Sequence, residues 1–227
     1  SQGPSSVDMV IERATKPISL SDFKKLSSNK NTIILDVRHQ EEFVKGFIPN
    51  SIFVGIDGGF APWVGAIIKF VETPILLVCN KDRLKETATR LSRVGFDNIL
   101  GYLQGGIKTW DVNDLQNVQS ISSDKFASIY KENKTIHIVD VRKASEYNSQ
   151  HIINAQLVPL IDLDNHQDRL TKLNENFVHC RAGYRSVIAC SILKRKGINN
   201  LINITGGFDA IKETSIPLSD SISSKTF

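Results

Sequence analysis

A cysteine at the junction of a predicted strand and a predicted helix is the strongest candidate for chemistry in this sequence. Cys180 follows the strand-like residues 176–179, and a helix-like pattern begins within one turn of it. The first N–H groups of a helix have no partner inside the helix, and the helix dipole adds positive potential, so a thiolate or another anion is stabilised there. Cys180 is therefore predicted to be a nucleophile, with Arg181 and Arg185 supplying positive charge.

The residues after Cys180 are predicted to form a ring of backbone amides around its sulfur. Gly183 permits a positive φ in the middle of that ring. The spacing is Cys-x4-Arg, one residue shorter than the Cys-x5-Arg ring that cysteine-dependent phosphatases wrap around phosphate, and the smaller ring suits a sulfur atom carried on cysteine. The predicted anion-binding loop is Arg181, Ala182, Gly183, Tyr184, Arg185 and Ser186.

This loop resembles the active loop of the rhodanese family of sulfurtransferases, Cys-x-x-Gly-x-Arg. The resemblance implies a thiosulfate or persulfide sulfurtransferase in which Cys180 takes sulfur from a small anionic donor and carries it as a persulfide. A thiol, sulfite or cyanide would then accept the sulfur. Such chemistry needs no cofactor and no metal.

Composition narrows the other classes of function. The 227 residues are 41% hydrophobic and 23% charged, which allows one or two domains with packed cores. The three cysteines, Cys79, Cys180 and Cys190, form no Cys-x-x-Cys pair, which favours free thiols in a reducing, cytoplasmic location over a zinc site or disulfides. The net charge of +4 is mild and no apolar run approaches the ~18 residues of a membrane span, so neither nucleic acid nor a membrane is expected as a partner.

The same unit occurs twice in the sequence. Asp36-Val37-Arg38 returns as Asp140-Val141-Arg142, and a pair of glycines at 105–106 returns at 206–207. Copies of this size are plausible autonomous domains. The predicted organisation is an N-terminal linker (1–15), a first domain (16–112), a linker (113–119), a second domain (120–214) and a polar tail (215–227).

Each copy alternates short β-branched runs with helix-period segments. This alternation predicts the α/β class, with a mainly parallel sheet flanked by helices in each of two tandem domains. The helices after the cysteine strands, 83–94 and 185–196, are predicted to stop at Gly95 and Gly197. Ligands bind such sheets beyond the carboxyl ends of the strands, where both Cys79 and Cys180 fall.

The two cysteine loops differ. Residues 79–83 of the first copy lack the glycine and one residue of the second, and Asp82 would place an anion beside any thiolate. The first copy is therefore predicted to be degenerate and the second catalytic. An alternative stays open, in which Cys79 is a second sulfur carrier with Arg83 as its cation.

Other polar residues near the loop are interpreted as structural. Asp140 and Arg142 stand at a strand end, where opposite charges on one face can pair beneath the loop. The rhodanese resemblance implies that these two residues and Glu146 hold the fold around the loop. His179 should point to the opposite side of the strand from Cys180. His151 and Cys190 are also predicted to be structural.

Residues 46–65 narrow the resemblance. They are similar to the first rhodanese-like repeat of proteins that fuse a metallo-β-lactamase-fold domain to two such repeats, among them persulfide dioxygenase-like sulfurtransferases. Gln2-Gly3-Pro4 resembles the link that follows that domain. The resemblance implies that the chain is the carboxyl-terminal part of a longer polypeptide, or a truncated form, with a metallo-β-lactamase-fold domain as partner.

Two other functions remain open at this point. A cysteine-dependent phosphatase or arsenate reductase would also hold a thiolate in a ring of anion-binding amides, although the short loop counts against it. A non-catalytic binding or regulatory module is the second alternative. It fits the first copy better than the second, which keeps the glycine and both arginines.

Overall fold

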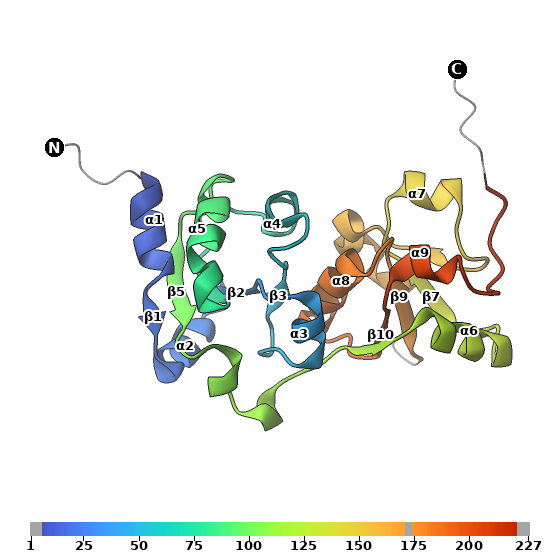
Figure 1. Cartoon of the computed structure of the whole chain (residues 1–227), viewed down its shortest axis with the longest axis horizontal. Helices are drawn as coiled ribbons and strands as arrows, with labels where there is room; N and C mark the ends of the chain where they lie inside the picture. Colours follow the sequence, from blue (N-terminus) through green and yellow to red (C-terminus); the bar gives the residue numbers. More distant parts are fainter. Residues whose placement is uncertain (1–5, 171–173, 222–227) are drawn as a thin grey trace, which may run out of the picture. The chain divides into compact units, whose positions relative to one another are not determined.

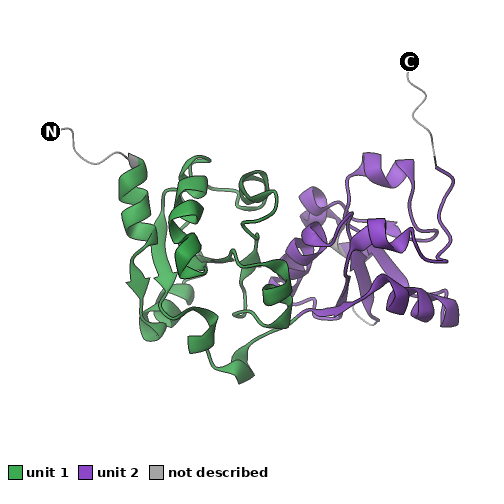
Figure 2. Ribbon diagram, in the orientation of Figure 1, with its two compact units in different colours: residues 1–117 green, residues 118–227 purple. Residues whose placement is uncertain are grey.

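The chain folds into two compact units, residues 1–117 and 118–227 (Figure 2). The computed structural model describes residues 6–170 and 174–221. Within these ranges each unit holds one five-stranded sheet in which all paired strands are parallel. The predicted pair of α/β domains is confirmed.

The first unit orders its strands β1-β5-β4-β2-β3 (Figure 1). Its central strand, β4 (Ile75–Val78), consists of four buried apolar residues, as expected for a strand covered on both faces. The other elements are α1 (Ser6–Ala14), β1 (Pro17–Ile18), α2 (Leu20–Ser27), β2 (Ile33–Asp36), α3 (Gln40–Lys45), β3 (Ile52–Phe53), α4 (Phe60–Ile67), η1 (Lys81–Arg83), α5 (Leu84–Ser92), β5 (Ile99–Leu103), η2 (Gly106–Thr109) and η3 (Val112–Asp114).

The second unit repeats this topology, with the order β6-β10-β9-β7-β8. Its central strand, β9 (Asn176–His179), is also wholly buried but begins and ends with a polar residue. The other elements are β6 (Gln119–Ile121), α6 (Ser123–Glu132), β7 (His137–Asp140), α7 (Ala144–Ser149), β8 (Gln156–Leu157), η4 (Leu160–Arg169), α8 (Tyr184–Arg195), β10 (Leu201–Ile204) and α9 (Gly207–Ile211). The predicted ends of α5 and α8 hold, since both helices stop before a glycine with positive φ.

Residues 6–14 form the helix α1, where the sequence predicted an N-terminal linker over residues 1–15. This helix packs against α5 and β5 of the first unit, as Figure 1 shows. Val10 and Ala14 are buried, and their four-residue spacing places both on one face of the helix. The sequence pattern did not indicate this amphipathic helix, because only a few apolar residues mark its buried face. Gln2, Gly3 and Pro4 lie outside the described residues.

The other predicted boundaries also shift. The division falls between residues 117 and 118, and β6 begins inside the expected linker 113–119. In the expected polar tail, Ile216 is buried and Leu218 forms an antiparallel bridge to Ile152. The Ser219 N–H donates to the His151 carbonyl at 2.8 Å. Residues 215–219 therefore belong to the second unit, while 222–227 lie outside the described residues.

The packing of α1 generates a stability prediction. Val10→Asp would bury a carboxylate on the face that α1 presents to α5 and β5, and should lower the free energy of unfolding of the first unit by at least about 2 kcal/mol. The matched control is Met9→Asp, because Met9 is 46% exposed. Both tryptophans, Trp63 and Trp110, lie in the first unit, so their fluorescence in urea reports on it. Equal midpoints for the two variants would contradict a packed α1.

Candidate active site

Cys180 stands at the carboxyl end of the central strand of the second unit. β9 ends at His179, Cys180 follows it, and α8 begins at Tyr184. Gly183 has a φ of 94°, so the positive φ predicted for this position is confirmed. The glycine lets the chain turn from strand to helix within three residues, and Cys180 is only 1% exposed at the bottom of the resulting loop.

The sulfur of Cys180 has two polar partners in the loop. The Gly183 N–H donates to Sγ at 3.1 Å. The thiol lies 3.6 Å from the Ser186 hydroxyl oxygen, which accepts from it and itself donates to the Gly183 carbonyl. The Gly183 amide therefore faces the sulfur at hydrogen-bond distance, as expected for an amide of the predicted ring. An N–H directed at sulfur stabilises a negatively charged sulfur atom.

Both loop arginines are paired with carboxylates, which the sequence analysis did not predict. Arg185 donates through Nη1 and Nη2 to the two carboxyl oxygens of Glu146, at 2.6 and 2.7 Å. These hydrogen bonds lower the pKa of Glu146 to about 2. Arg181 is 69% exposed in its side chain and donates to Asp209 at 3.2 Å. Glu146 thus orients a loop residue directly, and neither arginine is an isolated cation.

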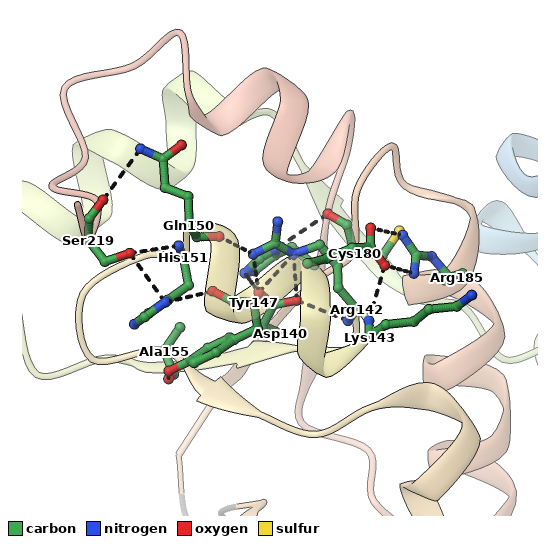
Figure 3. Close-up of polar contacts among 12 residues, drawn as sticks. Asp140, Arg142, Lys143, Tyr147, Gln150, His151, Ala155, Cys180, Arg185 and Ser219 are labelled. Atoms are coloured by element: carbon green, nitrogen blue, oxygen red, sulfur yellow. Dashed lines mark hydrogen bonds and ion pairs between the residues drawn. The ribbon is translucent and has the colours of Figure 1, made fainter. Parts of the chain in front are cut away.

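A buried ion pair lies beneath the loop, as the sequence predicted. Arg142 donates to Asp140 at 2.7 Å and to the Gln150 carbonyl at 2.8 Å (Figure 3). Asp140 is fully buried and Arg142 is 3% exposed, with its guanidinium 3.8 Å from the centre of the Phe208 ring. The first unit repeats the arrangement with Arg38, Asp36 and the Gly46 carbonyl. Because both units contain the pair, it belongs to the fold rather than to chemistry at one site.

His179, His151 and Cys190, which the sequence predicts to be structural, have contacts that fit that role. His179 is fully buried, with Nδ1 3.3 Å from the Cys180 carbonyl oxygen and Nε2 3.8 Å from Asp140, and burial lowers its pKa. His151 stacks on Tyr147 with ring centres 3.8 Å apart. Cys190 is fully buried within α8, and burial raises the pKa of its thiol to about 12.

The double-glycine turn, Gly206-Gly207, leads directly into residues that hold the Cys180 loop, and the sequence did not predict this contact. The N–H groups that follow it donate to the loop carbonyls: Phe208 to Cys180 at 2.7 Å and Asp209 to Arg181 at 2.9 Å. A Cβ on Gly207 would lie 2.5 Å from the Cys180 carbonyl oxygen. The repetition of two glycines in both copies was the available signal, but sequence alone did not show what approached them.

The cysteine of the first unit lies in a different environment. The Cys79 thiol donates to the Asn80 carbonyl at 3.2 Å, and burial raises its pKa to about 11. Arg83, which the alternative reading pairs with Cys79, donates instead to Asp57 at 2.9 Å and to Glu86 at 2.8 Å. The Cys79 sulfur is therefore a neutral thiol at pH 7.

Over residues 6–170 and 174–221, no group of three or more His, Cys, Asp or Glu side chains could hold a metal ion. No helix in the same ranges is both long and apolar enough to cross a membrane.

Comparison with known families identifies both units. The family model of the rhodanese-like domain matches residues 19–113 and again residues 122–214. The chain therefore belongs to the rhodanese-like domain family and contains two such domains in tandem.

Individual relatives match the chain at modest identity, the curated ones over less than half of it. The Bacillus subtilis protein YrkF is 28% identical over 90 residues, covering 40% of this chain and 49% of YrkF. The chain thus spans about half the length of that relative. A protein of Allochromatium vinosum named sulfurtransferase is 25% identical over 101 residues, covering 44% of this chain and 94% of its own. The structure of a thiosulfate sulfurtransferase from Pseudomonas aeruginosa is 18% identical, with a TM-score of 0.41, over 97% of this chain and 45% of that one.

The approach of the double-glycine turn to the loop can be tested with a matched pair of variants. Gly106 and Gly207 both have positive φ, so alanine is strained at either position by about 1–2 kcal/mol. Of these two positions, only Gly207 has backbone atoms close to the added Cβ. Gly207→Ala should therefore lower the free energy of unfolding of the second unit by about 1–3 kcal/mol more than Gly106→Ala lowers that of the first unit. Urea titrations followed by two-dimensional NMR report on each unit separately. Equal costs would show that the turn does not support the loop.

The Glu146–Arg185 pair generates a pH prediction. A carboxyl group whose pKa is lower in the folded than in the unfolded state stabilises the fold above its unfolded pKa, and this stabilisation is lost as pH falls through the folded value. For Glu146 the loss should extend from about 4.5 down to about 2. The side-chain carboxyl resonance of Glu146 should titrate near pH 2, and in Arg185→Met its midpoint should move up towards 4.5. An unchanged midpoint in that variant would rule out Arg185 as the cause.

Proposed function

We propose that the second domain is a sulfurtransferase that moves sulfane sulfur through a persulfide on Cys180. The observation that carries this proposal is the Gly183 N–H directed at the Cys180 sulfur, 3.1 Å away, at the end of a parallel strand. Membership of the rhodanese-like family and the sulfurtransferase names among the relatives support the same reaction class.

The first half of the reaction loads the sulfur. The Cys180 thiolate attacks the outer sulfur of thiosulfate or of a low-molecular-weight persulfide, and a new sulfur–sulfur bond forms to Sγ. The bond inside the donor breaks, and its electron pair leaves with sulfite or with the donor thiolate. Gly183 then stabilises negative charge on the bound sulfur through its N–H.

The second half returns the enzyme to its starting state. A thiol, sulfite or cyanide attacks the outer sulfur of the persulfide, and the electron pair of the broken bond returns to Sγ. In this mechanism Arg181 receives the anionic end of donor and acceptor, because its side chain is exposed at the loop. Arg185 has a different role: its bidentate bond to Glu146 ties the start of α8 to α7 and so positions the loop.

Several further expectations accompany this proposal. The donors are small anions that bear sulfane sulfur, and the setting is a reducing cytoplasm in which Cys180 stays free. Neither nucleic acid nor a membrane is needed as a partner. The association with a metallo-β-lactamase-fold domain in the same natural polypeptide stays a prediction from sequence resemblance.

Intact mass spectrometry tests the proposal. After incubation with thiosulfate or glutathione persulfide, the wild-type chain should gain one sulfur atom, and Cys180→Ser should gain none. Cys79→Ser is the matched control and should gain the same sulfur as wild type, because the neutral Cys79 thiol is a poor nucleophile. Turnover with cyanide as acceptor should follow the same pattern.

Three other results would redirect the proposal. Loss of the adduct in Cys79→Ser, with Cys180→Ser unaffected, would make the first domain the sulfur carrier. Turnover of p-nitrophenyl phosphate that depends on Cys180 would instead support the phosphatase alternative. A folded protein without any adduct would favour the non-catalytic binding module.

A further inference from the structure

The first domain contains a cleft of about 620 Å³ at the position that corresponds to the Cys180 loop. The copy-one cleft lies between the cysteine loop, residues 79–81, and the double-glycine turn, Gly105-Gly106. The lining residues that matter below come from several elements: Arg38 follows β2, Glu42 lies in α3, Lys81 lies in η1, Tyr102 lies in β5, and Ile107 and Lys108 lie in η2.

The cleft exists because the loop and the turn do not pack together as they do in the second domain. There, a Cβ on Gly207 would lie 2.5 Å from the Cys180 carbonyl oxygen and 2.7 Å from that of Arg181. A Cβ on the corresponding Gly106 would meet no atom within 4 Å. The loop of the first copy is one residue shorter and enters its helix through the 3-10 turn η1, so it leaves open the space that the second copy fills.

The mouth of the cleft carries charges that the protein does not pair. Among residues 6–170 and 174–221, Lys81, Lys108 and Glu42 form no ion pair, and all three are exposed. In the second domain Glu146, at the position of Glu42, is paired with Arg185. Asp209, at the position of Lys108, is paired with Arg181. The replacement of an acidic by a basic residue there makes the mouth of the first cleft cationic on one side.

The floor of the cleft is neutral. The Cys79 thiol keeps its proton at pH 7, because burial raises its pKa to about 11. The Arg38 guanidinium is paired with Asp36 at 2.6 Å and also donates to the Gly46 carbonyl. Neither group therefore presents a net charge to a ligand. The charge preference of the cleft is set by Lys81, Lys108 and Glu42 at its mouth.

The size of the cleft suits an organic molecule rather than an inorganic ion. Small-molecule sites commonly enclose about 300–1,000 Å³, whereas a tetrahedral oxyanion fills only a small part of such a volume. The partly buried Ile107 and the ring of Tyr102, which is 8% exposed, supply contact surface for a carbon skeleton. Charges of both signs at the mouth match a ligand that bears both an anionic and a cationic group.

We propose that the copy-one cleft is a non-covalent binding site for a small zwitterionic organic molecule with the chemistry of a short peptide. Its carboxylate binds between Lys81 and Lys108, its ammonium group binds Glu42, and its body lies against the loop and the double-glycine turn. This site is separate from Cys180, and its existence does not depend on sulfur transfer.

S-methylglutathione is a suitable probe, because it is a short peptide that carries both an ammonium group and carboxylates, and its methylated sulfur cannot undergo exchange with any cysteine. Titration into the full chain, followed by amide NMR, should shift resonances of residues 79–83 and 104–108. Lys81→Glu combined with Lys108→Glu should weaken binding at least about tenfold, which corresponds to about 1.4 kcal/mol. The matched control is Lys85→Glu, an exposed lysine on α5 that does not line the cleft, and it should bind within twofold of wild type.

Glu42→Gln separates a zwitterion site from a simple anion site. It should weaken binding of S-methylglutathione but leave or improve binding of sulfate, which has no cationic group to lose. Equal affinity of wild type for sulfate and S-methylglutathione, or shifts confined to the second domain, would overturn the proposal. Cys180→Ser should bind the probe as wild type does, so failure of sulfur transfer and failure of this site would be told apart.

Discussion

A buried pair of opposite charges at the end of one strand underlies both domains. Asp140 and Arg142 are separated by one residue, and the arginine reaches back to the carboxylate and across to the Gln150 carbonyl. Removing one member of such a buried pair typically costs about 3–5 kcal/mol, because the other charge is left uncompensated. The pair fixes the segment after β7, on which Glu146 and therefore Arg185 depend. The ring of Phe208 lies over the Arg142 guanidinium. The N–H groups of Phe208 and Asp209 donate to carbonyls of the Cys180 loop.

The two copies show how one frame can support two kinds of loop. Strand order, ion pair and double-glycine turn are shared, whereas one residue and one glycine separate the cysteine loops. In the second domain the turn closes on the loop and holds an N–H against the sulfur. In the first domain the turn stands free and the sulfur is a neutral thiol. The first domain keeps the sheet and the buried ion pair although its cysteine loop and double-glycine turn do not pack together. The fold therefore does not depend on the geometry of the cysteine loop.

Much of the architecture was readable from the sequence, because hydrophobic period and repeats are local signals. Central strands such as Ile75–Val78, the positive φ of Gly183 and the Asp140–Arg142 pair all follow from residue type and short spacing. The pairing of Arg185 with Glu146 was not predicted, since it joins residues 39 positions apart and depends on how α7 faces α8. The helix α1 was missed for another reason: nine residues with two fully buried apolar side chains give a weak periodic signal.

The last described residues of the chain bear on the stability of the active loop. The stretch 216–219 is held by the buried Ile216 and a few backbone hydrogen bonds, among them Ile153 N–H to the Pro217 carbonyl at 3.1 Å. Elements secured by so few contacts open locally at a lower free energy than the sheet does. Such an opening would release residues 150–153, which include the carbonyl that anchors Arg142. A local opening of this edge would therefore reach the support of Cys180 without unfolding of the domain, so the rigidity of the reactive loop depends on a peripheral segment, bridged to the domain at Leu218, that takes no part in its chemistry.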